Sequence, residues 1–199
     1  EIQQGDWSSD VCSSDLQTVY EVAKANGIYI PVLCHHEQIK PVGACRVCVV
    51  EVEKARSLVA SCAMPAEDGM VVHTSTPRVL NARRLTVELL MTQGHHQCIT
   101  CESSGDCVLQ DLAYMLGIES PRFDEPAMYR AIEDANEMIA RDMNKCVLCG
   151  LCVRACNEVQ VNRVLDYSGR GPTAAVGPAF NLRYEDSECV FCGECVRVC

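Results

Sequence analysis

The sequence has few aromatic residues and few positive charges. Phe, Trp and Tyr make up 5% of its 199 residues, with one Trp, so an aromatic-rich core cannot hold the chain together. Lys and Arg number 17 against 27 Asp and Glu, which gives a net charge of −10. Nucleic acids and anionic membranes bind basic surfaces, so we expect neither as a partner. No apolar run approaches the roughly 20 residues of a membrane-spanning helix.

Signals for bond-making chemistry are also missing. The sequence has no G-x-G-x-x-G dinucleotide loop, no P-loop and no motif that supports a Ser/His/Asp arrangement. We therefore predict no catalytic residue within this sequence, and we leave open whether the protein is an enzyme. No basic and then apolar leader opens the chain, so secretion has no support and we expect a cytoplasmic location.

The first residues differ in character from the rest. Residues 6–16 read DWSSDVCSSDL, which matches the conceptual translation of a common sequencing-adapter oligonucleotide. We therefore expect residues 1–16 to be an artefact and exclude them from the fold prediction. A genuine Ser/Asp-rich segment is the alternative, and resequencing from an independent library distinguishes the two.

Cysteine is abundant, with 16 residues. Without a secretory leader, such a number is more typical of metal sites than of disulfides. Cys12 stands alone, and the other fifteen fall into four groups. These are C-x10-C-x2-C-x13-C from Cys34, C-x2-C-x5-C from Cys98, and two runs of C-x2-C-x2-C-x3-C from Cys146 and Cys189. With one histidine they supply sixteen ligands, enough for four four-ligand sites.

The doubled run, NKCVLCGLCVRAC and SECVFCGECVRVC, is the strongest motif. Its x2 spacings wrap a loop around one cubane cluster, whereas the fourth cysteine ligates the other cluster in two-cluster ferredoxins. We therefore assign one [4Fe-4S] site to Cys146, Cys149, Cys152 and Cys199, and a second to Cys156, Cys189, Cys192 and Cys195. Structural zinc, which pairs two C-x2-C knuckles, fits this spacing less well. The usual proline after the fourth cysteine is Asn157 here, but proline supplies no ligand.

The hydrophobic pattern and the turn residues predict a mixed α+β chain. Thr18 and Gly27 bracket a first helix, and Thr76 followed by proline is typical of the start of another. The expected helices span residues 18–26, 77–92, 107–116 and a stretch within 128–139, and the expected strands span 49–52, 58–60 and 70–72.

Four stretches carry a family resemblance: IYIPVLCHH (28–36), GACRVCVVEVEKARSLVASCAMP (43–65), CITCESSGDCVLQDLA (98–113) and NKCVLCGLCVRACNEVQ (144–160). They resemble the N-terminal iron–sulfur region shared by the 75-kDa-type subunit of respiratory complex I, NAD-linked formate dehydrogenase α subunits, hydrogenase diaphorase subunits and [FeFe] hydrogenases. The resemblance covers roughly residues 17–199. It implies a plant-type [2Fe-2S] β-grasp domain over 17–76, a small helical [4Fe-4S] domain with one histidine and three cysteine ligands over 77–118, a connector over 119–139, and a bacterial-type 2[4Fe-4S] ferredoxin domain over 140–199, truncated at its C-terminus.

By this resemblance, the [2Fe-2S] ligands are Cys34, Cys45, Cys48 and Cys62. The first gap differs from the C-x4-C-x2-C spacing of plant-type ferredoxins and is that of the complex I variant. A β-grasp fold opens with a hairpin, whose place is taken here by residues 1–16. We therefore expect the sheet to lack its first two strands.

The second group resembles the family's [4Fe-4S] site with one histidine, and Cys98, Cys101 and Cys107 match its cysteines. The usual H-x3-C pattern would place the histidine at Gly94, which has no side-chain ligand. We prefer His96, because some relatives use the shorter H-x-C spacing, and His95 is the alternative. A three-cysteine or empty site is the remaining possibility.

The resemblance implies an electron-transfer module with one [2Fe-2S] and three [4Fe-4S] clusters. We expect it to relay electrons between a flavin/NAD(H)-reactive partner subunit and a second redox centre. The alternative is the N-terminal part of a catalytic subunit, a molybdopterin formate dehydrogenase or an [FeFe] hydrogenase, with a catalytic domain downstream. The lack of a spanning segment is compatible with a place in a membrane-associated complex. A structural zinc protein is the remote alternative.

Overall fold

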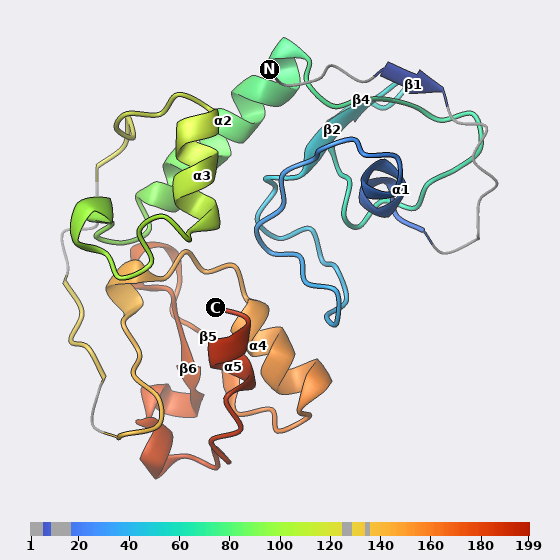
Figure 1. Ribbon diagram of the computed structural model, residues 1–199. Helices are drawn as coiled ribbons and strands as arrows, with labels where there is room; N and C mark the ends of the chain where they lie inside the picture. The colour runs from blue at the N-terminus through green and yellow to red at the C-terminus, as the bar shows by residue number, and fades with distance from the viewer. Residues whose placement is uncertain (1–5, 9–16, 125–128, 134–135) are drawn as a thin grey trace. The chain divides into compact units, whose positions relative to one another are not determined.

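The computed structural model describes residues 6–8, 17–124, 129–133 and 136–199 (Figure 1). These residues form two compact units, neither of which is continuous in sequence. The first unit contains the described residues up to 35, with 41–88 and 105–120, and the second contains 36–40, 89–104 and the described residues from 121 to 199. No helix in these described ranges is long and apolar enough to cross a bilayer.

The first unit is built on a four-stranded antiparallel sheet with one helix against it. The helix is α1 (Val19–Ala25), and the strands are β1 (Asp6–Ser8), β2 (Val49–Val52), β3 (Val59–Ala60) and β4 (Val71–His73), in the order β1-β4-β2-β3. The shared core includes Val19 from the helix and Val50 from the sheet, and it also includes Cys48 and Cys62. Two of the candidate ligands are therefore part of the hydrophobic core itself.

Helix α1 begins and ends where its sequence predicts. The Thr18 hydroxyl accepts a hydrogen bond from the Glu21 amide at 3.3 Å, and the Glu21 carboxylate accepts one from the Thr18 amide at 2.7 Å. This reciprocal capping box satisfies two free amide groups at the start of the helix. Gly27 follows its end with φ +71°. The predicted helix 18–26 and the strands 49–52, 58–60 and 70–72 are confirmed to within one residue at each end.

Strand β1 corrects one expectation. The predicted absence of both N-terminal strands is wrong for one of them, because Asp6–Ser8 pair antiparallel with Val71–His73 of β4. Without that strand, the outer edge of β4 would expose unpaired N–H and C=O groups, and an extended segment of almost any sequence can satisfy them. Residues 1–5 and 9–16 lie outside the described residues, so the artefact assignment stays a prediction.

Two longer helices confirm the predicted helices 77–92 and 107–116. They are α2 (Pro77–Met91) and α3 (Val108–Met115). The Thr76 hydroxyl accepts a hydrogen bond from the Val79 amide at 3.3 Å, which is the cap expected of a threonine before a proline. Arg84 on α2 donates to the carbonyl of Gly117, just beyond α3, at 2.8 Å. This bond ties the two helices together within the first unit.

The second unit contains short helices and one hairpin. Helix α4 (Leu151–Arg154) continues into a π-turn at Ala155–Val159, α5 (Glu194–Arg197) is equally short, and β5 (Leu165–Ser168) pairs antiparallel with β6 (Ala175–Pro178). Each of the two helices follows a glycine with positive φ, Gly150 at +73° and Gly193 at +79°. Helices of one turn are not stable alone, so their stability must come from what packs around them.

The helix predicted within 128–139 is wrong for the described part of that stretch, 129–133 and 136–139. The amide oxygen of Asn136 accepts hydrogen bonds from the backbone N–H groups of Met138 and Ile139, at 3.0 and 2.8 Å. An asparagine that bonds to the amides following it closes a turn instead of continuing a helix. Residues 128 and 134–135 lie outside the described residues.

Residues 36–40, which we call the strap, belong to the second unit although they follow Cys34 closely in sequence. Ile39 is 3% exposed and packs with Leu151, Ala155 and Val198 around α4 and α5. The strap therefore supplies an apolar side chain to the core of the C-terminal repeat.

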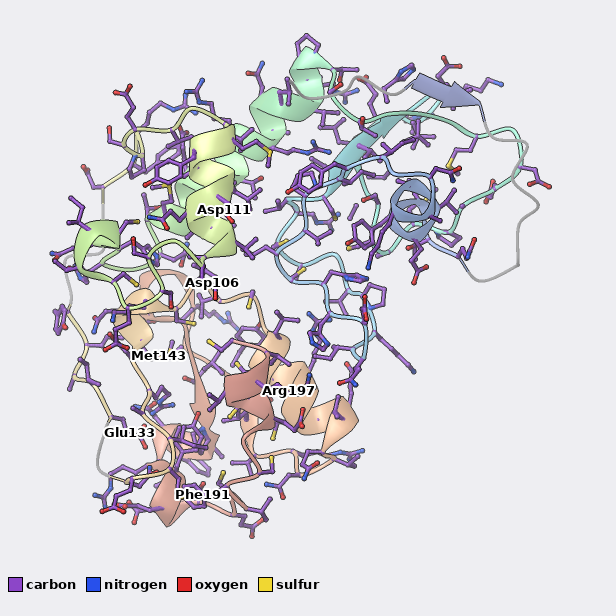
Figure 2. All side chains as sticks on the ribbon, in the orientation of Figure 1. Asp106, Asp111, Glu133, Met143, Phe191 and Arg197 are labelled. Atoms are coloured by element: carbon purple, nitrogen blue, oxygen red, sulfur yellow. The ribbon has the colours of Figure 1, made fainter. Side chains whose placement is uncertain are left out.

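Polar contacts hold the strap on both sides of Ile39. Arg154 on α4 donates to the Lys40 carbonyl at 2.6 Å, and the Lys40 amide donates to the Glu158 carboxylate at 3.1 Å. Arg197 on α5 (Figure 2) donates to the side-chain oxygen of Gln38 at 2.8 Å. The strap is thus fixed by both halves of the repeat.

Candidate metal centres

The first cysteine group converges in the core of the first unit. Cys34, Cys45, Cys48 and Cys62 are all buried free thiols. The Cys45 amide donates to the Cys34 sulfur at 3.4 Å, and the sulfurs of Cys48 and Cys62 lie 3.3 Å apart. Cys48 lies directly before β2 and Cys62 soon after β3, so the pairing of these two strands holds their sulfurs together.

The proton affinities of these thiols are strongly linked. The hydrogen bond with Cys62 lowers the pKa of Cys48 to about 6. The same hydrogen bond raises the pKa of Cys62, as do burial and the nearby negative charges of the other three sulfurs. Several buried thiols that cannot all ionise without a cation form a natural metal site, because a metal replaces their protons and neutralises their charge. The residues therefore fit a thiolate-bound cofactor.

Four cysteines of the C-terminal repeat influence one another through their charges. Burial raises the pKa of Cys152 to about 12, and the charges of Cys149, Cys146 and Cys199 contribute to that rise. Burial also raises the pKa of Cys146, with Cys199 again contributing. Cys199 comes from the second copy of the repeat, so a cysteine of the second copy acts electrostatically on two cysteines of the first.

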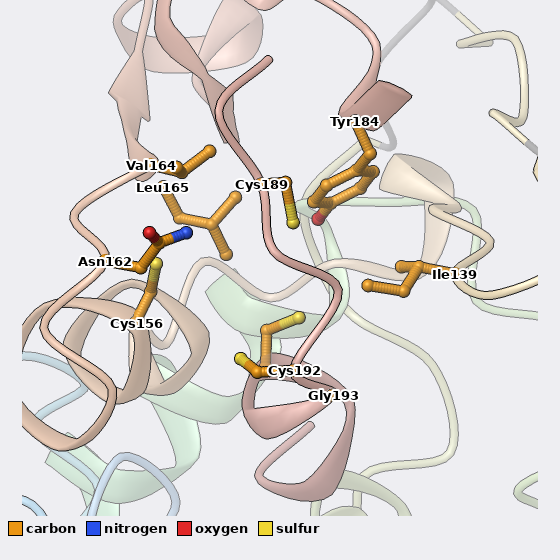
Figure 3. Close-up of a pocket in the computed structure, with 10 residues that line it drawn as sticks. Ile139, Cys156, Asn162, Val164, Leu165, Tyr184, Cys189, Cys192 and Gly193 are labelled. Carbon is orange, nitrogen blue, oxygen red and sulfur yellow. The ribbon is translucent and has the colours of Figure 1, made fainter. Parts of the chain in front are cut away.

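The other four predicted ligands line one pocket (Figure 3). Its walls are formed by Cys156, Cys189, Cys192 and Cys195 with Ile139, Asn162, Val164, Leu165, Tyr184 and Gly193. Burial raises the pKa of Cys195 to about 11, with contributions from the charges of Cys189 and Cys192. Cys156 reaches this pocket from the π-helical turn after α4, and such π-bulges in helices are frequent at functional sites. The first copy of the repeat thus contributes a thiol to the pocket of the second.

Three non-glycine residues inside C-x2-C gaps have positive φ. The sequence did not predict this conformation. Arg46, Leu148 and Phe191 have φ of +60°, +54° and +51°. The amides of Leu148 and Phe191 donate to the sulfurs of Cys146 and Cys189, both at 3.4 Å. Left-handed backbone costs an L-residue about 1–2 kcal/mol, so it persists where the surroundings require it. Here it aims N–H groups at sulfurs, which stabilises thiolate charge.

The third group divides between the two units, with Cys98 and Cys101 in the second and Cys107 in the first. Nearby, the His95 amide donates to the Asn144 carbonyl at 2.7 Å. A Cβ added at Gly94 would overlap that same carbonyl oxygen, and it would lie 3.4 Å from Nε2 of His96. A histidine at position 94 therefore has no room here. The ring of His96 lies next to the position that the Cβ of such a histidine would take.

Among the residues that the structure describes, no three His, Cys, Asp or Glu side chains converge closely enough to hold a single metal ion.

Comparison with known families accounts for most of the described chain. Residues 14–77 match the 2Fe-2S iron-sulfur cluster binding domain, residues 83–122 the NADH-ubiquinone oxidoreductase-G iron-sulfur binding region, and residues 145–199 the 4Fe-4S dicluster domain. One similar solved structure is a chain of an NAD+-reducing [NiFe]-hydrogenase in the H2-reduced state. It is 40% identical with a TM-score of 0.75, over 82% of this chain and 68% of that chain.

This protein belongs to the iron–sulfur family of NADH-quinone oxidoreductase G and NAD-linked hydrogenase subunits. Relatives include the NADP-reducing hydrogenase subunit HndD of Solidesulfovibrio fructosivorans, 44% identical over 85% of this chain, and the mitochondrial 78 kDa subunit of NADH-ubiquinone oxidoreductase from Neurospora crassa, 40% identical over 76%. This member of the oxidoreductase G family carries 2Fe-2S and 4Fe-4S domains of ferredoxin type and is an electron-transfer module. It spans less than a third of the length of the curated relatives it matches, 30% and 21% for these two.

Proposed function

We propose that this chain relays electrons through one [2Fe-2S] and three [4Fe-4S] clusters inside a larger NAD(H)-linked oxidoreductase. The observation that carries the proposal is that each copy of the repeat has one cysteine that lines the pocket, or acts on the ionisation, of cysteines in the other copy. Cys156 lines a pocket with Cys189, Cys192 and Cys195, while Cys199 affects the ionisation of Cys152. Exchanged fourth cysteines are the hallmark of two neighbouring [4Fe-4S] sites, and zinc knuckles do not need them.

The proposed ligands are the sequence-predicted ones. They are Cys34, Cys45, Cys48 and Cys62 for [2Fe-2S]; His96, Cys98, Cys101 and Cys107 for one [4Fe-4S]; Cys146, Cys149, Cys152 and Cys199 for another; and Cys156, Cys189, Cys192 and Cys195 for the last. When bound, these clusters accept and release single electrons. The chain supplies the thiolates, N–H donors to the sulfurs of Cys34, Cys146 and Cys189, and an apolar core around the first group.

The names of the relatives indicate the setting. They include an NADP-reducing hydrogenase, an NADH-ubiquinone oxidoreductase and an NAD+-reducing hydrogenase. We propose that a flavin/NAD(H)-reactive subunit exchanges electrons with this relay, that a second redox centre lies at its other end, and that both are cytoplasmic. A second candidate is the N-terminal part of a catalytic subunit. The observation that favours it is that the chain matches only 30% of the hydrogenase subunit HndD.

Anaerobic reconstitution tests the proposal. The chain should bind about 14 irons, from 2 plus three times 4, turn brown, and give [2Fe-2S] and [4Fe-4S] EPR signals on reduction. Cys→Ser variants in each group should each remove one set of signals. A colourless protein with stoichiometric zinc would overturn the assignment.

The histidine ligand has its own test. We expect His96→Ala to remove about one [4Fe-4S] cluster, that is about four irons, and His95→Ala to leave the iron content unchanged. The reason is that the shorter H-x-C spacing assigns the ligand to His96, while the backbone bond from His95 to Asn144 survives loss of the His95 ring. His96→Cys should restore the cluster, with a more negative potential because thiolate replaces imidazole. Loss of the cluster in His95→Ala but not in His96→Ala contradicts the assignment.

A further inference from the structure

Arg83 is a buried cation in the first unit. It lies on α2, and only 5% of its surface is exposed. Burial of a charge is unfavourable, and an apolar residue of similar volume often gives equal or greater stability. The adjacent Arg84 has the same chemistry but a side chain 49% exposed. The burial of Arg83 therefore needs an explanation other than packing.

The guanidinium of Arg83 is bonded to the residue that follows a proposed [2Fe-2S] ligand. Its Nη2 donates to the carbonyl of Val49 at 2.8 Å, and Val49 directly follows Cys48 in the chain. Its Nε is buried and makes no hydrogen bond within the described part of the chain. One donor is thus fixed on the peptide next to a ligand, while another is left unused in a region of low polarity.

The charge of Arg83 is not cancelled by a carboxylate. No ion pair joins it to an acidic side chain among the described residues. Burial lowers the pKa of Arg83 to about 10, opposed by the negative charges of Cys48 and Tyr29. The side chain therefore remains protonated at neutral pH, and Cys48 is the first of the anionic groups that act on it.

We propose that Arg83 sets the reduction potential of the [2Fe-2S] centre held by Cys34, Cys45, Cys48 and Cys62, an inference that rests on the proposed function. Reduction adds one negative charge at the centre. A fixed positive charge favours that change, and the effect is strong where protein excludes water. Arg83 thus raises the potential by its charge, while the bond to Val49 keeps that charge in place. It acts on the centre without contributing a ligand.

Two substitutions separate charge from packing. Arg83→Met keeps much of the side-chain length and removes the charge, whereas Arg83→Lys keeps the charge. Arg84→Met is the matched control, since it removes the same charge from the next position on α2, where the side chain is half exposed and paired with Glu88. The full chain is reconstituted anaerobically, and the [2Fe-2S] EPR signal is followed in a redox titration.

We expect Arg83→Met to lower the ratio of reduced to oxidised centre at fixed potential about tenfold, which is ~59 mV for one electron. Arg83→Lys and Arg84→Met should remain near the wild type. An unchanged midpoint in Arg83→Met, or an equal shift in Arg84→Met, overturns the inference. If Arg83→Met does not bind the [2Fe-2S] cluster, binding of the cluster by Arg83→Lys still supports a role for the positive charge. Loss of the cluster in both variants assigns Arg83 a role in folding alone. Absence of the [2Fe-2S] signal in the wild type contradicts the proposed function instead.

Discussion

We expect iron-free protein to lose the cooperative unfolding of residues 140–199. Helices α4 and α5 have four residues each, and candidate ligands form part of the apolar clusters around them. Cys156 is a buried member of one cluster, and Cys152 packs against both. Without metal, thiols lie among these apolar side chains with no cation to replace their protons, and Cys156 is buried there. Because metal binding energy is then folding energy, its removal should leave this region without a stable native state.

Hydrogen exchange on the full chain measures this effect. Backbone amides of residues 140–199 should lose protection by about 100-fold or more in the iron-free form, a loss of nearly 3 kcal/mol in local stability. Their thermal transition should become broad. The control is the same sample after anaerobic return of iron and sulfide, which should recover both protection and a sharp transition. A sharp melt of this region without iron would show that its apolar clusters suffice.

We expect a second large effect, on the number of bound clusters, from paired substitutions that test whether the two repeats exchange their fourth cysteines. Cys156→Ser with Cys192→Ser changes two residues of the pocket in Figure 3, so we expect the loss of one cluster, about four irons. Cys156→Ser with Cys149→Ser changes one residue in each proposed site, so we expect the loss of two clusters, about eight irons. Both variants remove two thiols, and each therefore serves as the control for the other.

The alternative connection gives the opposite result. If the four cysteines of each run closed on one cluster, Cys156 and Cys149 would share a site and Cys156 and Cys192 would not. Iron analysis with Mössbauer or EPR spectroscopy distinguishes the two patterns. Loss of about eight irons from the first pair and about four from the second would contradict the proposed ligand sets.

Local signals predicted most of the regular structure. Thr18 and Thr76 act as helix caps, and Gly27 follows the first helix as expected. These signals act over three or four residues and can be read directly from the sequence. The stretch 128–139 misled the prediction because the side chain of Asn136 competes for backbone amides, and hydrophobic periodicity does not register such competition.

Cysteine spacing defines the candidate sites but not their surroundings. The fixed gaps limit which sulfurs can meet, so the repeat predicts the exchange of Cys156 and Cys199. The burial of Arg83 and the position of Ile39 depend on contacts with residues distant in sequence, which composition and periodicity do not encode. The left-handed residues Leu148 and Phe191 also escaped prediction, because neither is a residue type that favours positive φ.

The strap limits how this protein can be taken apart. A fragment cut at the edge of the dicluster match, residues 145–199, would leave behind Ile39 and the backbone of Lys40, which fill and cap the space beside α4. Such a fragment would present an apolar hollow to water. Transplanting the C-terminal ferredoxin portion into another host protein therefore requires a replacement for that isoleucine. Shuffling of these modules during evolution would have had to carry the strap and the C-terminal portion together.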